Sequence, residues 1–342
     1  MAEKDIIKHG DKVIAEINDR SSSEFEAYET YSRKMIDQKL SKISTGGSGN
    51  SNAGTGISGY DWSNRLICFD GDSLTAGSAG KFSTVTINIL GCSEKNIAQG
   101  GKAIFPDEVG AACDFRQRVS RIPHNVDLIF ICGDFNAAWS VAKTMEDCFA
   151  TGLDTWAGRW NAGLAAIKKS FPNVPVMLVS PWTTAPSSSK NKHILQYNSQ
   201  AMLTFARYWG CYFMDFSTET PMQLNFGHAW WSSTGLPNVH NNQRAADLVG
   251  MVLADRIKTI PAPEWSATDS VTLDVNTLSV AVGGTGVITP TLTGNYTNAW
   301  TSSDNNVACV LGGTVYGMSA GTATITCTTH NGVEASCVVT VS

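Results

Sequence analysis

The chain has 342 residues, of which 42% are hydrophobic and 16% are charged. This length predicts two or three domains, and the composition allows most of the chain to bury a core. The formal net charge of −5 leaves no strongly basic face, so we expect no nucleic-acid partner. The start, MAEKDIIKHG, has no apolar signal region, and no apolar run is long enough to cross a bilayer. We therefore expect a soluble chain that is made in a cytoplasm and has no membrane partner.

The first 45 residues are rich in charged residues and helix formers. A helical face can be traced through Phe25, Tyr28, Met35, Ile36, Leu40 and Ile43. Because so short a segment cannot bury a core alone, we expect residues 1–45 to form a helical oligomerisation or anchoring segment. Residues 46–59, which contain GGSGNSNAGTGISG, are small and polar and predict a flexible linker.

From residue 60 to residue 260, apolar strand-like runs alternate with amphipathic helical stretches. The runs are residues 65–70, 126–132, 174–180 and 211–216, and the helical stretches are 155–171, 199–209 and 242–257. Solid apolar strands separated by helices are typical of a parallel sheet that is covered on both faces. The sequence therefore predicts an α/β domain whose active site lies at the carboxyl ends of the strands.

Cysteine and histidine give no sign of a metal site. The nine cysteines contain no C-x-x-C pair, and the six histidines are scattered without ligand spacing. We expect no metal and no organic cofactor. Cys327 and Cys337 could pair across neighbouring strands, although we expect them to be reduced.

The composition changes after a proline-bearing hinge at residues 261–268. Residues 269–342 contain short alternating runs with turn residues between them, which predicts a small antiparallel β-sandwich. The stretch from NAWTSSDNNVACV to GTVYGMSAGTATI resembles a bacterial Ig-like group 2 domain. That resemblance implies a spacer or adhesive module.

The stretch FDGDSLTAG, residues 69–77, places Ser73 directly after the first strand of the α/β region. Gly71, Asp72 and Gly77 flank it in a turn that opens a helix, whose backbone N–H groups could hold an oxyanion. Ser73 could thus be a nucleophile. The alternative is that Ser73 or Asp72 merely caps the next helix.

FDGDSLTAG resembles block I of the SGNH (GDSL) hydrolase family, which carries the serine nucleophile. Block II of that family is similar to NIAQGG at 96–101, which implies that Gly101, or alternatively Gly100, supplies an oxyanion N–H. Block III corresponds to CGDFNAAW at 132–139 and implies an oxyanion role for Asn136. This block departs from the family, because Phe135 stands where the family has asparagine. Asn136 could instead cap the following helix.

Block V of the family resembles PNVHNNQRAADLVG at 237–250 and implies that His240 is the catalytic base. His228 is the reserve candidate. Pro237 occupies the place of the acid that orients the histidine in the family, and proline has no side-chain acceptor. A backbone carbonyl, Asp134 or Asp215 could orient His240 instead.

The resemblance implies a flavodoxin-like three-layer fold and a serine esterase that removes O-acyl groups, by preference O-acetyl groups, from a carbohydrate. Three tryptophans in the predicted loops could stack on sugar rings, although core packing is the commoner role for this residue: Trp139, Trp182 and Trp230.

The order of modules, with no signal peptide, resembles that of bacteriophage virion fibre proteins. This second resemblance implies a trimer formed through residues 1–45, contacts with other virion proteins and a place on the virion surface. It also supports a rival hypothesis, a structural or adhesive fibre whose SGNH-like domain binds a host glycan without cleaving it. The two hypotheses are compatible, because a fibre can also be an esterase.

Overall fold

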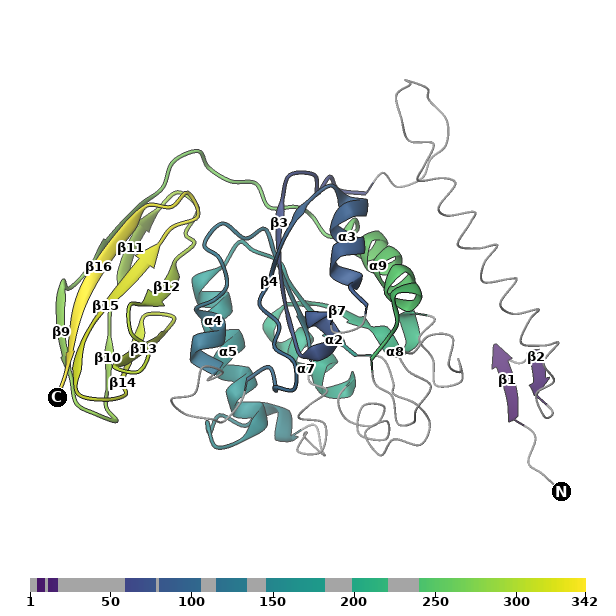
Figure 1. Ribbon diagram of the computed structural model, residues 1–342, viewed down its shortest axis with the longest axis horizontal. Coiled ribbons are helices and arrows are strands. Elements are labelled where there is room, and N and C mark those ends of the chain that lie inside the picture. The colour runs from purple at the N-terminus through teal and green to yellow at the C-terminus, as the bar shows by residue number, and fades with distance from the viewer. Residues whose placement is uncertain are drawn as a thin grey trace. The chain divides into compact units, whose positions relative to one another are not determined.

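The computed structural model describes residues 5–9, 12–17, 59–77, 80–105, 115–133, 146–181, 199–220 and 240–342. The chain divides into two units, Met1–Ser58 and Gly59–Ser342. Figure 1 shows the described elements of each. Every helix within the described ranges is too short or too polar to cross a membrane.

The described part of the first unit is an antiparallel hairpin of strands β1 (Asp5–His9) and β2 (Lys12–Ile17). Our prediction of a helix over residues 1–45 is therefore wrong for these two segments. Their sequences, DIIKH and KVIAEI, are rich in β-branched residues, which favour strands, and the Gly10-Asp11 pair between them favours a turn. The apolar stripe from Phe25 to Ile43 lies outside the described residues, so its role stays a prediction.

The second unit begins with a parallel sheet, as the sequence predicted, and the sheet has a fifth strand, β4 (Ser93–Asn96), in addition to the four strands that the sequence indicated. Its strands are β3 (Leu66–Gly71), β4 (Ser93–Asn96), β5 (Leu128–Cys132), β6 (Val176–Ser180) and β7 (Tyr212–Asp215). The order is β4-β3-β5-β6-β7, and every neighbouring pair is parallel. The chain adds β4 on one side of β3 and the later strands on the other, so the connections change direction between β3 and β5. Ligand sites of such sheets lie outside the carboxyl ends of the strands at this point.

Helices cover both faces of the sheet (Figure 1). Helices α3 (Phe82–Leu90) and α9 (Gln243–Ile257) share a buried cluster with one face, through residues such as Phe69 and Phe130. Helices α5 (Trp156–Ser170) and α7 (Ser199–Trp209) share a second cluster with the other face, through Ile129 and Ile131. The alternation of neighbouring β5 residues between the two clusters is the period-two pattern of a strand buried on both sides. The described ranges of the domain also contain the shorter helices α2 (Ser73–Ala76), α4 (Phe115–Val119) and α8 (Phe216–Glu219). The 3-10 turn η2 (Glu146–Phe149) precedes α5.

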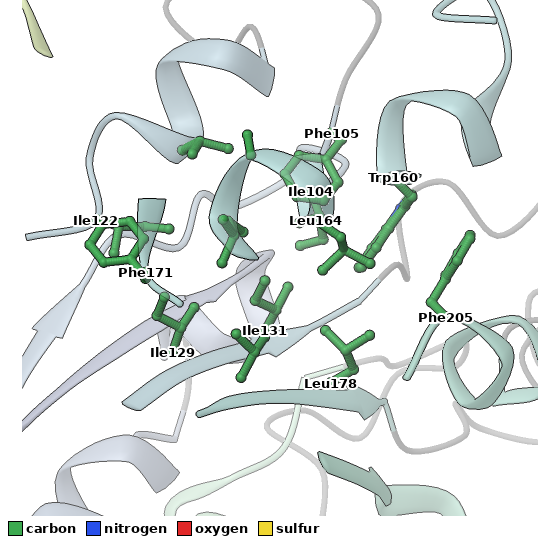
Figure 2. Packing of buried hydrophobic residues seen from close by; sticks show 14 of the residues in the cluster. Ile104, Phe105, Ile122, Ile129, Ile131, Trp160, Leu164, Phe171, Leu178 and Phe205 are labelled. Carbon is green, nitrogen blue, oxygen red and sulfur yellow. The ribbon is translucent and has the colours of Figure 1, made fainter. Parts of the chain in front are cut away.

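Aromatic rings fill the cluster beneath α5 and α7 (Figure 2). The ring of Trp160 stacks on that of Phe205 with centroids 5.5 Å apart and meets Phe105 edge to face at 5.0 Å. Complete burial of one such side chain stabilises the fold by about 1.5–3 kcal/mol. The same cluster packs against Gly133 at the end of β5, where an added Cβ would lie 2.9 Å from the Trp160 ring. The core thus fixes one of the strand ends that border the candidate site.

Residues 270–341 form the predicted β-sandwich. One sheet joins β12 (Ala299–Ser302), β15 (Gly321–Thr328), β16 (Glu334–Val341) and β9 (Thr277–Val280), and its β16–β9 pair is parallel. The others join β10 (Thr285–Val287), β14 (Thr314–Gly317) and β13 (Ala308–Leu311), and β11 (Pro290–Thr293) with β8 (Ser270–Leu273). Cys327 and Cys337 lie on neighbouring strands but are not bonded, and burial raises the pKa of Cys327 to about 12.

We expected the link at residues 261–268 to act as a hinge, but its Trp265 contacts both the α/β domain and the β-sandwich. Trp265 Nε1 donates a hydrogen bond to Asp127 of the α/β domain at 2.6 Å. The Trp265 ring also stacks on the His330 ring of the sandwich, with centroids 3.8 Å apart. The backbone N–H of Asn298 adds a bond to the Ser170 carbonyl at 2.8 Å. These contacts fix the sandwich to the α/β domain.

Candidate active site

The turn that presents Ser73 joins β3 to α2. The side chain of Asp72 caps α2 by accepting a hydrogen bond from Leu74 N at 2.9 Å, and Gly77 ends the helix with a left-handed φ of 75°. Asp72 thus performs the capping that we had considered as an alternative role for Ser73. Ser73 is the first residue of the helix, and its hydroxyl group is available for another contact.

That contact is with His240. The distance between His240 Nε2 and Ser73 Oγ is 2.9 Å, across 167 residues of chain. His240 lies just before α9, whose first turn is fixed by Asn242 as it accepts a bond from Ala245 N at 3.0 Å. Partial burial lowers the pKa of His240 below its ordinary value, which favours the neutral imidazole that a general base requires. The structure therefore brings together the two residues that we had singled out as nucleophile and base.

A glycine-bearing loop after β4 lies beside Ser73. Its backbone continues the pairing with β3, because Gln99 N donates to the Gly71 carbonyl at 2.9 Å. A Cβ on Gly100 would lie 3.7 Å from Ser73 Cβ, whereas a Cβ on Gly101 would meet nothing within 4 Å. Gly101 has a left-handed φ of 73°, the conformation for which glycine is suited in a turn. Of our two candidates, Gly100 is therefore the one packed against Ser73, and Gly101 makes the turn.

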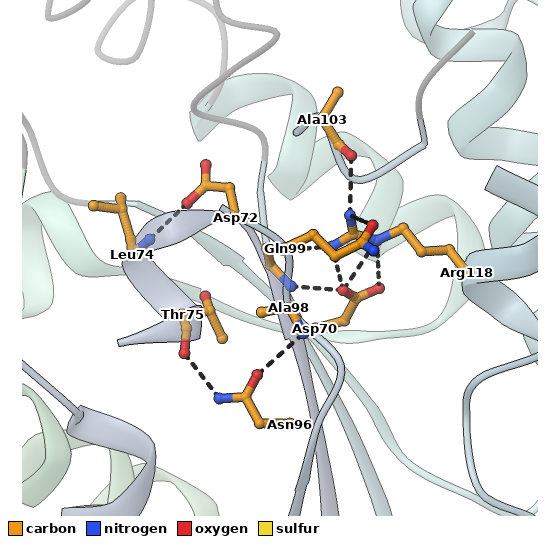
Figure 3. A network of polar contacts seen from close by, with 10 residues as sticks. Asp70, Asp72, Leu74, Thr75, Asn96, Ala98, Gln99, Ala103 and Arg118 are labelled. Carbon is orange, nitrogen blue, oxygen red and sulfur yellow. Dashed lines mark hydrogen bonds and ion pairs between the residues drawn. The ribbon is translucent and has the colours of Figure 1, made fainter. Parts of the chain in front are cut away.

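Asn96, the first residue of the block II match, joins this loop to the serine turn. Its Nδ2 donates to the Thr75 carbonyl in α2 at 2.9 Å, and its Oδ1 accepts from Ala98 N at 3.0 Å (Figure 3). The sequence placed an asparagine here without indicating this contact. Asn96 holds the end of β4 against α2.

Asp215, one of our candidates for the acid that orients His240, has other partners. Its carboxylate accepts hydrogen bonds from Ser199 Oγ at 2.5 Å, Ser217 Oγ at 2.6 Å and Ser217 N at 2.9 Å. Within the described part of the chain, none of its bonds reaches His240. Asp215 caps α8 and links it to α7, so the structure does not support the orienting role that we had considered for it.

The other predicted site residues lie outside the described ranges, and their roles stay predictions. They are Asp134, Asn136, Trp139, Trp182, His228 and Trp230. Pro237, which stands where the family has its orienting acid, also lies outside these ranges.

Sequence reasoning missed a buried ion pair beneath the site. Asp70 and Arg118 are 3% and 1% exposed, and Arg118 Nε donates to Asp70 Oδ1 at 3.1 Å (Figure 3). One signal was available. An aspartate inside the apolar run LICFDG is seldom buried unless it is paired. Nothing local in the sequence identified its partner.

We predict that Asp215→Asn lowers stability slightly and, if Ser73 acts as a nucleophile on esters, leaves that hydrolysis nearly unchanged. The amide retains one acceptor for the α8 cap but loses the charge-assisted bonds from two serine hydroxyls, a loss of about 1 kcal/mol. Urea unfolding and steady-state kinetics on the same preparation check both halves. In serine proteases, replacing the orienting acid by its amide lowers turnover about 10⁴-fold. A loss of that size at Asp215, with stability unchanged, would contradict the assignment.

Several solved structures are similar to rather more than half of the chain. No family model and no curated protein sequence matches the chain. A protein from Lactobacillus plantarum has 14% identity and a TM-score of 0.49, over 58% of this chain and 98% of that one. A possible lipase from Chitinophaga pinensis has 15% identity and a TM-score of 0.45, over 56% and 97%.

A third solved structure is that of Est24, a carbohydrate acetylesterase from Sinorhizobium meliloti. It has 15% identity and a TM-score of 0.37, over 57% of this chain and 98% of that chain. We therefore assign the α/β fold of the chain from its strand order, β4-β3-β5-β6-β7, and from the helices on both faces of the sheet, and not from these similarities.

Proposed function

We propose that the chain is a serine esterase of the SGNH type, with Ser73 as nucleophile and His240 as base. The observation that carries the proposal is the 2.9 Å contact between His240 Nε2 and Ser73 Oγ at the carboxyl end of a parallel sheet. A serine hydroxyl attacks an acyl carbon efficiently only when a neighbouring base removes its proton. The lowered pKa of His240 supports that role, because the base is then neutral at neutral pH.

In the proposed reaction, His240 Nε2 takes the Ser73 proton as Ser73 Oγ bonds to the acyl carbon. The carbonyl oxygen becomes an oxyanion, for which the backbone N–H groups of Ser73 and Gly100 are candidate donors. The Asn136 side chain is a further candidate, which the sequence resemblance implies. The C–O bond to the alcohol then breaks, and His240 returns the proton to the leaving oxygen. Water attacks the acyl-enzyme with His240 again as base, which releases the carboxylic acid and restores Ser73.

The substrate class that we propose is an O-acetylated carbohydrate. Support comes from the sequence resemblance and from three tryptophans that we expect from the sequence to lie near the site: Trp139, Trp182 and Trp230. Acetylated oligosaccharides should therefore be hydrolysed with a higher kcat/KM than a simple aryl acetate.

The test is hydrolysis of p-nitrophenyl acetate by the wild type and by Ser73→Ala. We expect turnover in the wild type and its loss in Ser73→Ala. Ser63→Ala, which changes an exposed serine before the amino end of β3, is the matched control and should retain full activity. Equal turnover in the wild type and Ser73→Ala, or none in either with both proteins folded, would overturn the proposal.

The second candidate function is binding of a host glycan without cleavage. The observation that favours it is Pro237, which stands where the family has its orienting acid. This candidate predicts binding of intact acetylated glycan, measurable by calorimetry, and no release of acetate. Acetate release that depends on Ser73 would exclude it.

We also propose that the chain is displayed on a virion surface as a trimer, through residues 1–45. The support is the order of modules in the sequence, from the N-terminal segment and Gly/Ser linker to the α/β domain and the sandwich. Light scattering on the whole chain tests the assembly. A monomer at micromolar concentration would count against it.

A further inference from the structure

The buried pair of Asp70 and Arg118 occupies the junction between the serine turn and the glycine loop (Figure 3). Asp70 comes three residues before Ser73, in β3, and Arg118 comes from α4. Besides Asp70, the guanidinium of Arg118 binds the Gly71 carbonyl, the side chain of Gln99 and the carbonyl of Ala103. One side chain therefore touches both segments that flank the reacting oxygen.

Each of these contacts sets a distance that matters for the reaction. Arg118 Nη1 donates to Gln99 Oε1 and to the Ala103 carbonyl, both at 3.2 Å, and so holds the loop that contains Gly100 from both ends. The Gly71 carbonyl, next to the serine turn, accepts hydrogen bonds from Arg118 Nη2 and from Gln99 N. This one carbonyl therefore binds both the arginine and the glycine loop. Asp70 Oδ1 accepts from Gly71 N at 2.7 Å and fixes the peptide that leads to Ser73.

The buried ion pair of Asp70 and Arg118 is better suited to positioning the turn and the loop than to stabilising the fold. A buried ion pair loses hydration that its own attraction repays only in part, so an apolar pair of similar volume is often as stable. The planar guanidinium, however, offers five donors in fixed directions, which lysine and apolar side chains cannot reproduce. Its particular contribution here is geometric.

We infer that Arg118 is a positioning residue that fixes the separation between the Ser73 turn and the Gly100 loop. This inference depends on the proposed function of Ser73. Arg118 is 1% exposed, and none of its bonds within the described residues is to Ser73 Oγ. We therefore expect it to affect the geometry of the transition state and not substrate binding. A misplacement of about 1 Å in such a site can cost about 100-fold in rate.

The first variant is Arg118→Lys, which keeps a charge beside Asp70 but cannot bind Asp70, Gly71, Gln99 and Ala103 together. We expect kcat to fall about 10- to 100-fold with KM within about twofold of the wild type. The matched control is Arg65→Met. Arg65 forms an ion pair with Asp127 at 3.2 Å, and it directly precedes β3, the strand that contains Asp70. Arg65→Met should leave kcat unchanged.

The second variant, Asp70→Asn with Arg118→Met, separates positioning from folding. It removes both buried charges and keeps an acceptor for Gly71 N, so we expect its urea midpoint to lie close to that of the wild type. It also removes every bond from residue 118 to the glycine loop. Low kcat in this stable double variant supports positioning, whereas activity that recovers together with stability would overturn it.

Amide hydrogen exchange on the same proteins gives a readout that does not require activity. We expect the peptide that covers residues 97–103 to exchange at least about tenfold faster in both Arg118 variants, with β5 and β6 unchanged. Unchanged exchange in that peptide would overturn the inference. If the wild type shows no hydrolysis dependent on Ser73, the proposed function fails, and the exchange data alone decide whether Arg118 holds the loop.

Discussion

His240→Ala is expected to lower kcat/KM for ester hydrolysis by about 10³- to 10⁴-fold. Ser73 Oγ contacts His240 Nε2 at 2.9 Å, and without that acceptor the hydroxyl proton has no strong base to receive it. The change removes a half-buried side chain at the surface of the site and not a core residue, so the fold should persist. Steady-state kinetics together with urea unfolding measure the two effects separately.

The wild-type pH profile gives an independent check of the same assignment. Burial lowers the pKa of His240 from its ordinary value of about 6.5, and the neutral form is the active base. Log kcat/KM should therefore rise with pH, bend below pH 6.5 and be flat at neutral pH. His240→Ala should lose this acid limb. His124→Ala, a change at the join between the two domains, is the control and should retain both the rate and the limb.

One outcome of the pH profile would indicate that a carboxylate orients His240. A carboxylate that binds the imidazole stabilises its charged form and raises the pKa. An acid limb centred above pH 7 would thus contradict a histidine governed by burial. It would indicate an anionic partner behind His240, for which Asp134 is the remaining sequence candidate.

The sheet could be predicted because its inner strands are almost wholly apolar. Strands β3, β5, β6 and β7 begin and end within two residues of the runs identified in the sequence, and α5, α7 and α9 within one residue of the predicted helices. Strand β4, whose sequence is SEKN, gave no such signal. It is one of the two edge strands, its side chains are exposed or half-buried, and backbone pairing to β3 is what defines it.

The site was predictable only where the chemistry is local. A strand, a glycine-rich turn and a helix that are contiguous in sequence made Ser73 a candidate, and the family resemblance then favoured the nucleophile over a helix cap. His240 was chosen by resemblance, because a lone histidine in a loop has no pattern of its own. Arg118 and Asp70 are 48 residues apart, and only the fold brings them together.

Gly71→Ala is expected to destabilise the chain by about 2–3 kcal/mol, in the range of overpacked core sites. Gly71 is buried at the end of β3, and an added Cβ would lie 2.1 Å from Thr75 Oγ1 and 3.2 Å from the Cys132 carbonyl. The turn must shift to make room, and Ser73 is two residues away. We therefore expect activity to fall more steeply than the folded fraction. Urea unfolding and kinetics on the folded protein measure both effects.

Two further variants test this explanation of Gly71. Thr75→Ala should not rescue Gly71→Ala, because the Thr75 Cβ itself lies 2.4 Å from the added methyl, whereas Thr75→Gly removes both atoms and should recover part of the lost stability. Gly100→Ala is the control for stability. Its added Cβ would meet Ser73 only at an ordinary contact distance of 3.7 Å, so its free energy of unfolding should stay within about 1 kcal/mol of the wild type. If Gly71→Ala unfolds at the wild-type midpoint, the close approach of Thr75 is not what requires glycine at this turn.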